Sequence, residues 1–531
     1  MTEKHLLLGD EALALGALHE GLSGVYAYPG TPSTEITEFI QGHPLTRERN
    51  IHCAWSSNEK TAMEAALGAS YAGGRALVCM KHVGMNVCAD GFMGAAMTGA
   101  NGGLVVTACD DPSMHSSQNE QDSRFYADFA MVPCFEPSSQ QETYEMVRYA
   151  FHFSEKMRIP VLMRLTTRMA HSRAVVETRE IKPQNEIHFP ENPRQWVLLP
   201  VNAKVRNKAL IEDNARFAEA AETSPFNRLI GGRDNTMGII ACGIAYNYLM
   251  ENYPDGCPYP VLKVSQYPFP EGLTRQLAAQ TRTLLVLEEG QPFIEKRLKG
   301  VFDSGLTIKG RLDGTLPRTG ELSPDCVRTA LGLPERPALA ASEVPVPRPP
   351  ALCQGCGHRD FYTALNAVLK DYPTSRVFSD IGCYTLGWLA PFHAFHTCVE
   401  MGASLTMACG AADCGVWPSV AVIGDSTFTH SGMTGLLDAV NANADITLCI
   451  SDNLTTGMTG GQDSAGTGRL EAICLGIGVD PAHLRTIVPL PKNYPEMEQT
   501  IREELEYHGV SVIICRRECI QTARRHANQK K

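Results

Sequence analysis

Two polar chain segments in the C-terminal third of the sequence could bind a metal ion together. The apolar run at 420–423 ends in Gly424-Asp425-Ser426, and the apolar run at 446–450 ends in Asp452-Asn453. We interpret both runs as buried strands of one parallel sheet, joined by a helix at about 434–443. A carboxylate and a carboxamide at the same sheet edge suit a Mg²⁺ ion that binds mainly through a phosphate. Gly424 would let the backbone approach a diphosphate closely.

The same stretch resembles the thiamine-diphosphate fingerprint, in which a GDG or GDS turn is followed by an asparagine at the end of the next strand. The resemblance implies that Mg²⁺ is bound by the side chains of Asp425 and Asn453 and by the carbonyl of Thr455. It also implies that Ser426 contacts the diphosphate. The alternative is an ordinary strand–turn–helix–strand unit, in which the aspartate and the glycine serve only as turn residues.

Composition favours a globular protein of several domains. The chain has 531 residues, 44% of them hydrophobic and 20% charged, and this length predicts about three domains. Its net charge of −11 is spread without long runs of one sign, so neither nucleic acid nor an anionic membrane is an expected partner. The N-terminus reads as an amphipathic helix that starts near Asp10 and not as a signal peptide. With 18 cysteines and no such signal, we expect a reducing, cytoplasmic location.

Strand-like and helix-like segments alternate along most of the chain, which is the pattern of doubly wound α/β domains. We predict a domain at 1–175, a connector at 176–235, a smaller domain at 236–333, a proline-rich linker at 334–350 and a third domain at 351–531. The expected strands are 25–28, 76–80, 104–108, 161–163, 237–242, 261–264 and 283–287, and the expected helices are 58–72, 138–158 and 205–222. The predicted fold class is therefore three α/β domains.

A second group of residues with chemical potential is a set of cysteines in the third domain. Cys353 and Cys356 form a CxxC motif, and Cys383 and Cys519 are two further candidates. A lone CxxC is compatible with half of a zinc site, with a redox dithiol or with no function. Together with two remote cysteines it fits a four-thiolate iron–sulfur site. Most of the other cysteines lie in apolar runs, where a free cysteine acts as a small hydrophobic residue.

Several motifs together resemble the thiamine-diphosphate domain of 2-oxoacid:ferredoxin oxidoreductases. They are CQGCGHRDFY, DIGCYTLGW, GDSTFTHSG, DNLTTGMTG and the terminal CRREC. The resemblance implies that a 4Fe–4S cluster is held by Cys353, Cys356, Cys383 and Cys519. Cys515 is the alternative fourth ligand, because it lies close to Cys519 in the sequence. The resemblance also places Gly424, Tyr384, Thr385, Met401 and Gly402 in contact with the cofactor.

The N-terminal third resembles the alpha subunits of indolepyruvate ferredoxin oxidoreductases. The motifs are YPGTPSTEI, SSNEKTAMEAALGASYAGGRALV, KHVGMNVCAD and DDPSMHSSQNEQDSRFYADFA. The resemblance implies that Glu59 drives the aminopyrimidine toward its imino tautomer and that Thr31 contacts the substrate. His82 is a candidate proton donor or substrate contact, with a structural role as the alternative. His115 and Gln118 are weaker candidates; Gln118 stands where the pyruvate enzymes carry an arginine, consistent with a bulky aryl substrate.

The implied fold has pyrimidine-binding and diphosphate-binding domains on either side of a transketolase C-terminal-like domain. The implied reaction converts a 2-oxoacid, such as indolepyruvate, to an acyl-coenzyme A, with electrons passing to the cluster and then to ferredoxin or another acceptor. The implied assembly is a homodimer formed through the thiamine sites, joined by a smaller beta (gamma-type) subunit.

Two departures from the family pattern affect these expectations. No ferredoxin-like cysteine run follows Cys519, so we expect another subunit or carrier to take the electrons. The usual MTGHQPHPG motif is replaced by the sequence at 458–464, which lacks its histidines and leaves the substrate open. The alternative functions are a non-oxidative thiamine-dependent decarboxylase and a non-catalytic scaffold subunit.

Overall fold

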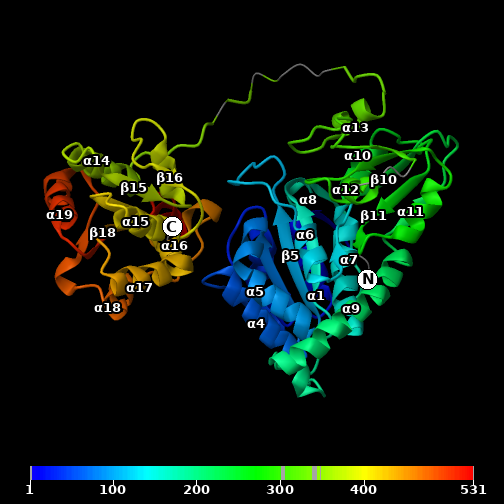
Figure 1. Cartoon of the computed structure of the whole chain (residues 1–531), viewed down its shortest axis with the longest axis horizontal. Coiled ribbons are helices and arrows are strands. Elements are labelled where there is room, and N and C mark those ends of the chain that lie inside the picture. The colour runs from blue at the N-terminus through cyan, green and yellow to red at the C-terminus, as the bar shows by residue number, and fades with distance from the viewer. Residues whose placement is uncertain (1–2, 301–304, 338–341, 343, 347, 530–531) are drawn as a thin grey trace. The chain divides into compact units, whose positions relative to one another are not determined.

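The computed structural model of the chain describes residues 3–300, 305–337, 342, 344–346 and 348–529. The chain divides into two compact units, Met1–Leu339 (unit 1) and Ala340–Lys531 (unit 2), and each is described by itself. Figure 1 shows helices and strands alternating along both units. The proline-rich linker predicted at 334–350 lies partly outside the described residues.

Among the described residues of unit 1, the larger sheet has seven strands in the order β12-β6-β7-β5-β4-β2-β3. All neighbours are parallel except β12 and β6. The strands are β2 (Gly24–Ala27), β3 (His52–Trp55), β4 (Ala76–Lys81), β5 (Leu104–Asp110), β6 (Cys134–Phe135), β7 (Val161–Thr166) and β12 (Gln266–Tyr267). The central strands are buried on both faces, which explains their continuous apolar sequences.

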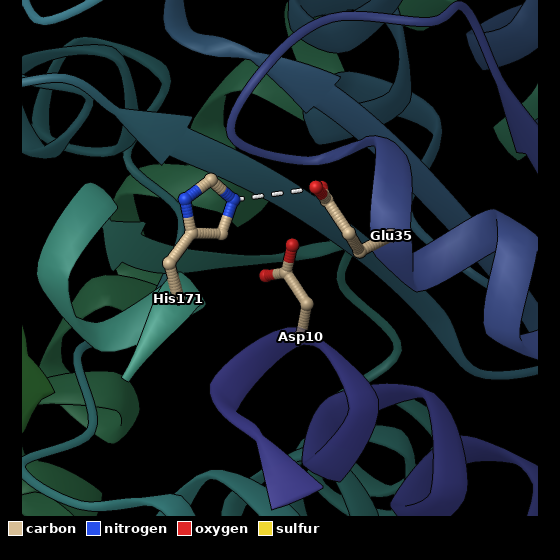
Figure 2. A group of neighbouring side chains, drawn as sticks. All are labelled: Asp10, Glu35 and His171. Atoms are coloured by element: carbon tan, nitrogen blue, oxygen red, sulfur yellow. Dashed lines mark ion pairs between the residues drawn. The ribbon is translucent and has the colours of Figure 1, made fainter. Parts of the chain in front are cut away.

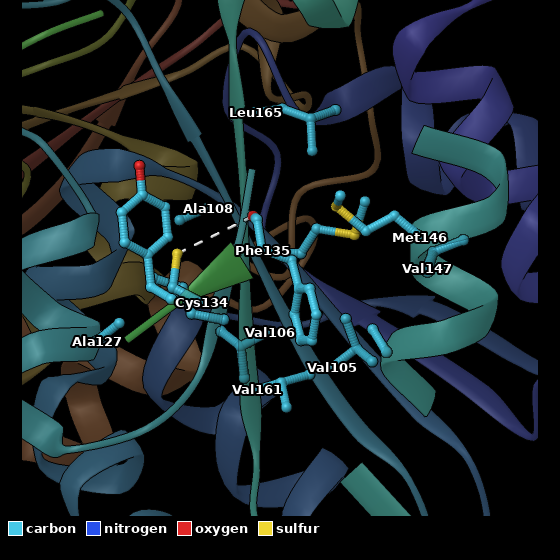
Figure 3. Close-up of a cluster of buried hydrophobic side chains, with 14 of the residues drawn as sticks. Val105, Val106, Ala108, Ala127, Cys134, Phe135, Met146, Val147, Val161 and Leu165 are labelled. Carbon is cyan, nitrogen blue, oxygen red and sulfur yellow. Dashed lines mark hydrogen bonds between the residues drawn. The ribbon is translucent and has the colours of Figure 1, made fainter. Parts of the chain in front are cut away.

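Helices cover both faces of this sheet (Figure 1). They are α1 (Gly9–His19), α2 (Thr34–Gly42), α3 (Pro44–Glu48), α4 (Glu59–Tyr71), α5 (His82–Thr98), α6 (Arg124–Ala130), α7 (Gln140–Met157) and α8 (Thr167–His171). Figure 3 shows part of the core, where Val105 and Val106 of β5 pack with Phe135 and Val161, all with 0% exposure. β-Branched residues suit these strands because their side chains pack well on a pleated surface.

The N-terminal helix differs from the prediction. It begins near Asp10, as expected, but a short strand β1 (Lys4–Leu8) precedes it and pairs with β8 (Arg173–Glu177). All residues of α1 except Glu11 are buried, so the helix is not amphipathic. The reason is that α2, α7 and α8 pack around it. The sequence pattern underestimated this burial because the covering elements are distant in the chain.

The described part of unit 1 also contains a five-stranded sheet in the order β14-β13-β10-β11-β9. Its strands are β9 (Arg228–Ile230), β10 (Gly238–Cys242), β11 (Val261–Val264), β13 (Thr283–Leu287) and β14 (Thr307–Lys309). Its helices are α10 (Ala245–Met250), α11 (Glu271–Ala278), α12 (Phe293–Lys299) and α13 (Pro324–Ala330). The long helix α9 (Pro200–Glu222) contacts α11 on this side and α5 and β12 on the side of the larger sheet. The strand β12, which follows β11, crosses over to pair with β6 of the larger sheet.

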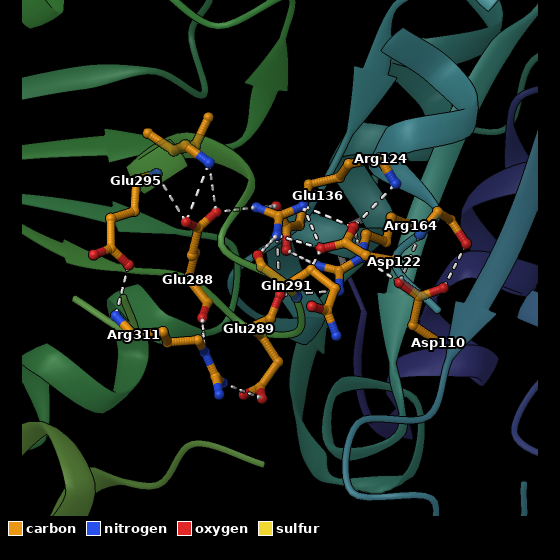
Figure 4. A network of polar contacts seen from close by, with 12 residues as sticks. Asp110, Asp122, Arg124, Glu136, Arg164, Glu288, Glu289, Gln291, Glu295 and Arg311 are labelled. Atoms are coloured by element: carbon orange, nitrogen blue, oxygen red, sulfur yellow. Dashed lines mark hydrogen bonds and ion pairs between the residues drawn. The ribbon is translucent and has the colours of Figure 1, made fainter. Parts of the chain in front are cut away.

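Buried ion pairs also join the two sheets of unit 1 (Figure 4). Arg124 lies 3.0 Å from Glu288, which follows β13 of the smaller sheet, and it also pairs with Asp122. Arg164 of β7 pairs with Asp110 and Glu136. These side chains have 0–3% exposure. Removing one partner would leave an uncompensated charge in the interior, so the network fixes the two sheets against each other.

Within the described part of unit 2, one sheet has six strands, all parallel, in the order β16-β15-β17-β18-β20-β19. The strands are β15 (Arg376–Ser379), β16 (Thr397–Cys398), β17 (Ser419–Gly424), β18 (Ile446–Asp452), β19 (Leu484–Ile487) and β20 (Val510–Arg516). The helices are α14 (Gly357–Leu369), α15 (Ala403–Asp413), α16 (Asp425–Thr427), α17 (Met433–Ala442), α18 (Leu470–Ile477), α19 (Tyr494–Glu506) and α20 (Ile520–Gln529). A π-helical turn, Phe428–Gly432, connects α16 to α17.

The strands and helices predicted from the sequence are all present, with ends that differ by a few residues. The prediction of an α/β fold with parallel sheets is confirmed. In the chain as described, no helix combines the length and the apolar character needed to span a membrane.

Candidate active site

The predicted catalytic residues of unit 1 lie at the carboxyl edge of the larger sheet. The chain passes from β2 to β3 on one side and then returns to β4 on the other side of β2. Doubly wound sheets bind their ligands at such a switch point, outside the carboxyl ends of the strands. Thr31 lies in the loop after β2, and His82 begins α5 directly after β4. The topology therefore brings both residues to the expected ligand position.

Glu59 is the first residue of α4, and its side chain is buried with 5% exposure. The Asn58 side chain caps the helix by accepting a 2.9 Å hydrogen bond from the Thr61 amide. Gly84 of α5 packs directly against Glu59, since a Cβ at this position would lie 2.8 Å from Oε1 of the glutamate. The helix N-terminus favours the negative charge of Glu59. The structural and the catalytic roles of this glutamate are therefore compatible.

His82 is fully buried and faces a backbone carbonyl. Its Nε2 lies 3.2 Å from the Asn119 carbonyl oxygen, so Nε2 carries the proton and donates. Burial lowers the pKa of His82, which keeps the ring neutral at neutral pH. Its Nδ1 has no hydrogen-bond partner among the described residues. In this state the free ring nitrogen is an acceptor, so His82 could take a proton or a hydrogen bond but would not give one.

The loop that carries Thr31 is held by its own hydrogen bonds. The Gly30 amide donates to Thr34 Oγ1 at 3.1 Å, and Ser33 Oγ donates to the Gly30 carbonyl at 2.7 Å. The hydroxyl of Ser116 donates to the Thr31 carbonyl at 3.5 Å. The loop is thus fixed before any ligand binds.

The two weaker candidates, His115 and Gln118, lie in the loop after β5. His115 and Gln118 are both exposed. His115 makes an ion pair with Glu321, at 3.4 Å, in the segment before α13. The structure therefore does not bring the His115 side chain into the group formed by Thr31, His82 and Glu59.

Unit 2 repeats the switch-point arrangement between β15 and β17. The chain passes from β15 to the edge strand β16 and returns to β17 on the other side. Asp425 follows β17, and Asn453 follows the neighbouring strand β18, where Gly424 is paired in register with Ser451. The predicted metal ligands therefore stand side by side at the carboxyl edge, as the sequence analysis expected of two strand ends.

The surroundings of Asp425 fit a bound cation. This residue is 2% exposed, and its Oδ2 has no hydrogen-bond partner among the described residues. Burial, together with the charge of Asp452, raises the pKa of Asp425 to about 7. Asp452 itself is already paired with Arg516 at 2.6 Å. A cation at Asp425 would supply the missing partner and restore the ionised form.

The other predicted metal ligands lie in a fixed loop. Asn453 Oδ1 accepts a 3.1 Å hydrogen bond from the Thr455 amide, and Thr455 Oγ1 donates to the Gln462 carbonyl at 2.9 Å. Ser426 lies across from this loop, with its Oγ 2.9 Å from Thr456 Oγ1. The predicted diphosphate contact therefore lies next to the predicted metal ligands.

Asp380, which the sequence analysis did not select, organises the remaining predicted contacts. Its buried carboxylate accepts hydrogen bonds from the Tyr384 hydroxyl and from the Gly402 amide at 3.2 Å. The Thr385 hydroxyl donates to its carbonyl at 2.7 Å. Met401, beside Gly402, is half-buried. A Cβ on Gly424 would lie 2.6 Å from the Tyr384 ring, so only glycine fits there.

The four predicted cluster cysteines surround one cavity of about 110 Å³ in unit 2, and Cys515 also lines it. Burial first, and then the nearby thiols of Cys356, Cys519 and Cys353, raise the pKa of Cys383 to about 12. Cys515 also lines the cavity, but it lies within β20, is 4% exposed, and its thiol donates to the Ile513 carbonyl at 3.9 Å. Cys519, which follows β20, is the better candidate for the fourth position of the group.

The thiol cavity adjoins the predicted metal edge. A Cβ on Gly457 would lie 3.0 Å from Cys383 Sγ and 3.5 Å from Asn453 Nδ2. The Cys519 amide donates to the Asn453 carbonyl at 3.0 Å. Gly457 and one backbone hydrogen bond thus connect the group of four thiols to Asn453, the predicted amide ligand at the sheet edge.

Comparison with known proteins shows the family. Residues 16–214 match the family model for the thiamine-diphosphate-binding part of pyruvate flavodoxin/ferredoxin oxidoreductase, and 380–515 match the C-terminal domain of thiamine pyrophosphate enzymes. The indolepyruvate oxidoreductase subunit IorA of Methanothermobacter marburgensis is 39% identical over 98% of this chain and 87% of its own length. The IorA subunit of Archaeoglobus fulgidus is 38% identical, with 97% and 86% covered.

The chain belongs to the IorA family. This IorA-family chain is therefore a catalytic subunit of a thiamine-diphosphate-dependent 2-oxoacid oxidoreductase, and the predicted family and enzyme class are confirmed. The roles of the individual site residues stay predictions, which the geometry above supports to different degrees.

A further polar group in the IorA-family chain was not selected from the sequence (Figure 2). The side chains of Asp10, Glu35 and His171, from α1, α2 and α8, bring one ligand atom each to within 4.8 Å of the others. His171 Nε2 lies 3.5 Å from Glu35 Oε2. Asp10 is fully buried, and neither carboxylate oxygen has a hydrogen-bond partner among the described residues. Burial, with the charge of Glu35, raises the pKa of Asp10 well above its usual range, so a protonated Asp10 accounts for this group.

Two larger surface hollows of unit 1, about 590 and 530 Å³, lie elsewhere. As described, they are lined by residues such as Arg148, Arg179, Arg158 and His188, and by none of the predicted site residues. The predicted site residues lie instead at the two switch points, where no hollow of that size is described.

Proposed function

We propose that this chain catalyses the oxidative decarboxylation of an aryl 2-oxoacid, of the indolepyruvate type, to an acyl-coenzyme A. The relatives carry the name indolepyruvate oxidoreductase, which supports the substrate class. The observation that carries the oxidative reaction is the four-thiol cavity beside Asn453. A non-oxidative decarboxylase does not need a redox centre next to its cofactor. A non-catalytic scaffold does not need the predicted metal ligands Asp425 and Asn453.

Mg²⁺ would be held by the Asp425 and Asn453 side chains and the Thr455 carbonyl. The unpartnered oxygen of Asp425 fits this role, because a buried carboxylate oxygen without a partner is costly. Asp380 would act indirectly, by holding Tyr384 and the Gly402 amide in place for the diphosphate.

When bound, thiamine diphosphate would supply a carbanion nucleophile for the 2-oxo carbon and an electron sink for decarboxylation. Glu59 would hydrogen-bond a ring nitrogen of the aminopyrimidine and hold the proton there, from a buried position with little competition from water. Thr31 would orient the substrate, and the acceptor nitrogen of His82 would face the reacting atoms. The fixed loop around Gly30 lowers the entropy cost of this positioning.

The thiolates of Cys353, Cys356, Cys383 and Cys519 would hold a 4Fe–4S cluster. Because the pKa values of Cys356 and Cys383 are raised, these thiols are protonated in the absence of a cluster. Cluster assembly must therefore release protons. Cys356 lies at the start of α14, where the helix dipole favours a thiolate. Cys519, rather than Cys515, is the fourth ligand in this proposal, because its thiol acts on Cys356 and Cys383.

We further propose that the enzyme is a homodimer joined by a smaller beta subunit, with coenzyme A as cosubstrate and ferredoxin or a related carrier as acceptor. In support, the relatives are named as subunits.

The test is anaerobic purification of the chain with its native partner, followed by a screen of 2-oxoacids with coenzyme A and a viologen dye. We expect dye reduction with indolepyruvate and phenylpyruvate to exceed that with pyruvate or 2-oxoglutarate. Iron and acid-labile sulfide should be present in equal amounts. Carbon dioxide release without dye reduction, from protein free of iron, would show a non-oxidative decarboxylase. Cofactor binding with no turnover of any 2-oxoacid would show a scaffold.

A further inference from the structure

Buried cations in unit 1 are neutralised with one exception. Among the described residues of the whole chain, the buried lysines and arginines are Lys81, Arg124, Arg148, Arg164, Lys263 and Arg311. All except Lys81 have a carboxylate within 4.0 Å among the described residues. Lys263, for example, pairs with Glu142. A buried charge without a counter-ion is costly, so the exception at Lys81 calls for a physical reason.

The polar surroundings of Lys81 do not supply that counter-ion. Its ammonium donates to the Ser116 carbonyl at 2.7 Å and to Ser116 Oγ at 3.3 Å. The charge of Asp111 acts on Lys81, but the Asp111 oxygens accept from the Ser116 amide, Ser117 Oγ and Thr167 Oγ1 at 2.5–2.8 Å. Asp111 therefore organises the loop after β5, and Lys81 keeps neutral acceptors only.

Lys81 lies at the sheet edge where doubly wound folds bind ligands. It ends β4, one of the two strands at the switch point of the larger sheet. Its Cβ packs against Gly30 of the Thr31 loop, where an added Cβ would lie only 3.0 Å away. The residue that holds its ammonium, Ser116, is exposed and also bonds the Thr31 carbonyl. Through Ser116, the Lys81 ammonium is thus connected to the loop that carries the predicted substrate contact, Thr31.

We propose that Lys81 binds the carboxylate of the 2-oxoacid substrate. This inference rests on the proposed function and adds the residue that recognises the one group every 2-oxoacid carries. The substrate carboxylate would complete an ion pair that the protein leaves open. A phosphate of coenzyme A is the other anion that could fill this position, and the experiment separates the two.

The charge of Lys81 should depend on pH. Burial lowers the pKa of Lys81 to about 8, and the charge of Asp111 opposes part of this decrease. The neighbouring His82 also interacts electrostatically with Lys81, and burial lowers its pKa, so it stays neutral. The ammonium form is therefore the main species at neutral pH and is lost above pH 8.

The experiment compares Lys81→Met, Lys81→Arg and the wild-type chain in the complex with the partner subunit. We expect Lys81→Met to raise KM for phenylpyruvate about 10- to 100-fold, as for the loss of a partly buried charge pair. The KM for coenzyme A and the affinity for thiamine diphosphate should not change. Lys263→Met, which removes a buried but paired lysine, is the matched control and should leave KM for phenylpyruvate unchanged.

A second measurement needs no variant that might fail to fold. In the wild-type complex, kcat/KM for phenylpyruvate should fall above about pH 8, and Lys81→Arg should abolish this fall because guanidinium stays charged. An unchanged KM in Lys81→Met, or a rise in KM for coenzyme A instead, would overturn the proposal. If no variant turns over a 2-oxoacid, the proposed function fails; calorimetry of phenylpyruvate with wild type and Lys81→Met then still decides whether Lys81 binds the carboxylate.

Discussion

The two switch points of the molecule have the same topology but opposite electrostatic needs. At the edge of the larger sheet in unit 1, Lys81 is a buried cation without a carboxylate partner among the described residues. At the edge of the unit 2 sheet, Asp425 has a buried oxygen without a hydrogen-bond partner in the part described. The first position suits an anion and the second a cation. The difference indicates that two sheet edges of the same topology can suit ligands of opposite charge, because each leaves a different buried group without a partner.

In the Arg124–Arg164 network, the buried charges are paired with one another and stabilise the fold (Figure 4). There each guanidinium contacts at least two carboxylates, and no ligand is needed to balance it. Removing one partner from this network should destabilise unit 1 by about 3–5 kcal/mol. At the switch points, by contrast, the partner is left for the ligand to provide.

The largest effect is expected from removing the Asp425 carboxylate of unit 2. Asp425→Ala should lower the affinity for thiamine diphosphate with Mg²⁺ by at least about 100-fold, because an ionised oxygen ligand is lost. Calorimetry with the cofactor and Mg²⁺ measures this. Asp445→Ala, at a half-exposed aspartate that pairs with His508 on the surface, is the control and should bind normally. Unchanged affinity in Asp425→Ala would remove the residue from the metal site.

Substitutions of the cavity cysteines test whether unit 2 binds a 4Fe–4S cluster in addition to Mg²⁺. Serine at Cys353, Cys356, Cys383 or Cys519 should abolish or destabilise the 4Fe–4S cluster, since each supplies one thiolate. Cys515→Ser should keep it, because the Cys515 thiol is buried within β20 and donates to the Ile513 carbonyl. Iron and sulfide analysis with electron paramagnetic resonance of the reduced protein provides the readout. Loss of the cluster in Cys515→Ser, with retention in Cys519→Ser, would reverse this assignment.

Glu59 separates cofactor binding from cofactor activation. Glu59→Gln should leave the affinity for thiamine diphosphate nearly unchanged, since the metal edge in unit 2 is intact. It should slow exchange of the C2 proton of the cofactor by about 10²–10⁴-fold, because an amide cannot hold the proton that a carboxylate holds. Nuclear magnetic resonance after quenching in deuterated buffer follows the exchange. Wild-type exchange in the variant would exclude Glu59 from activation.

The smallest effect concerns the group in Figure 2, where Asp10 also has unpartnered oxygens. Here the raised pKa of Asp10 indicates a bound proton instead of a cation. The folded state then holds a proton that the unfolded state releases above about pH 4, so the stability from this group falls as pH rises. Asp10→Asn should remove this dependence and raise Tm at pH 8 by about 2–4 °C, with a smaller gain at pH 5.

Thermal unfolding at both pH values, with and without Zn²⁺ or Mn²⁺, measures this prediction. A divalent ion that stabilises the wild type but not Asp10→Asn would show a metal site in place of the proton. Asp10 would then be, like Asp425, a buried carboxylate whose partner is a bound cation.

The sequence alone determined the parts of this protein whose signals are local. Apolar runs of strand length, followed by Gly424-Asp425 and by Asn453, placed two polar groups at one sheet edge, since the carboxyl ends of parallel strands meet there. The same reasoning located β4, β5 and α4 with Glu59 at its start. The motifs with Cys353, Cys356 and Cys383 identified the family through resemblance, before any geometry was known.

Only the tertiary structure decided which polar groups are paired and which are not. Lys81 and Lys263 look alike in sequence, but one meets Glu142 and the other meets neutral acceptors. The hydrogen bonds of Asp380, the pairing of β12 with β6 and the burial of nearly all of α1 also depend on contacts between distant segments. Burial and charge pairing depend on residues that are distant in the chain. The local sequence periodicity therefore does not predict them.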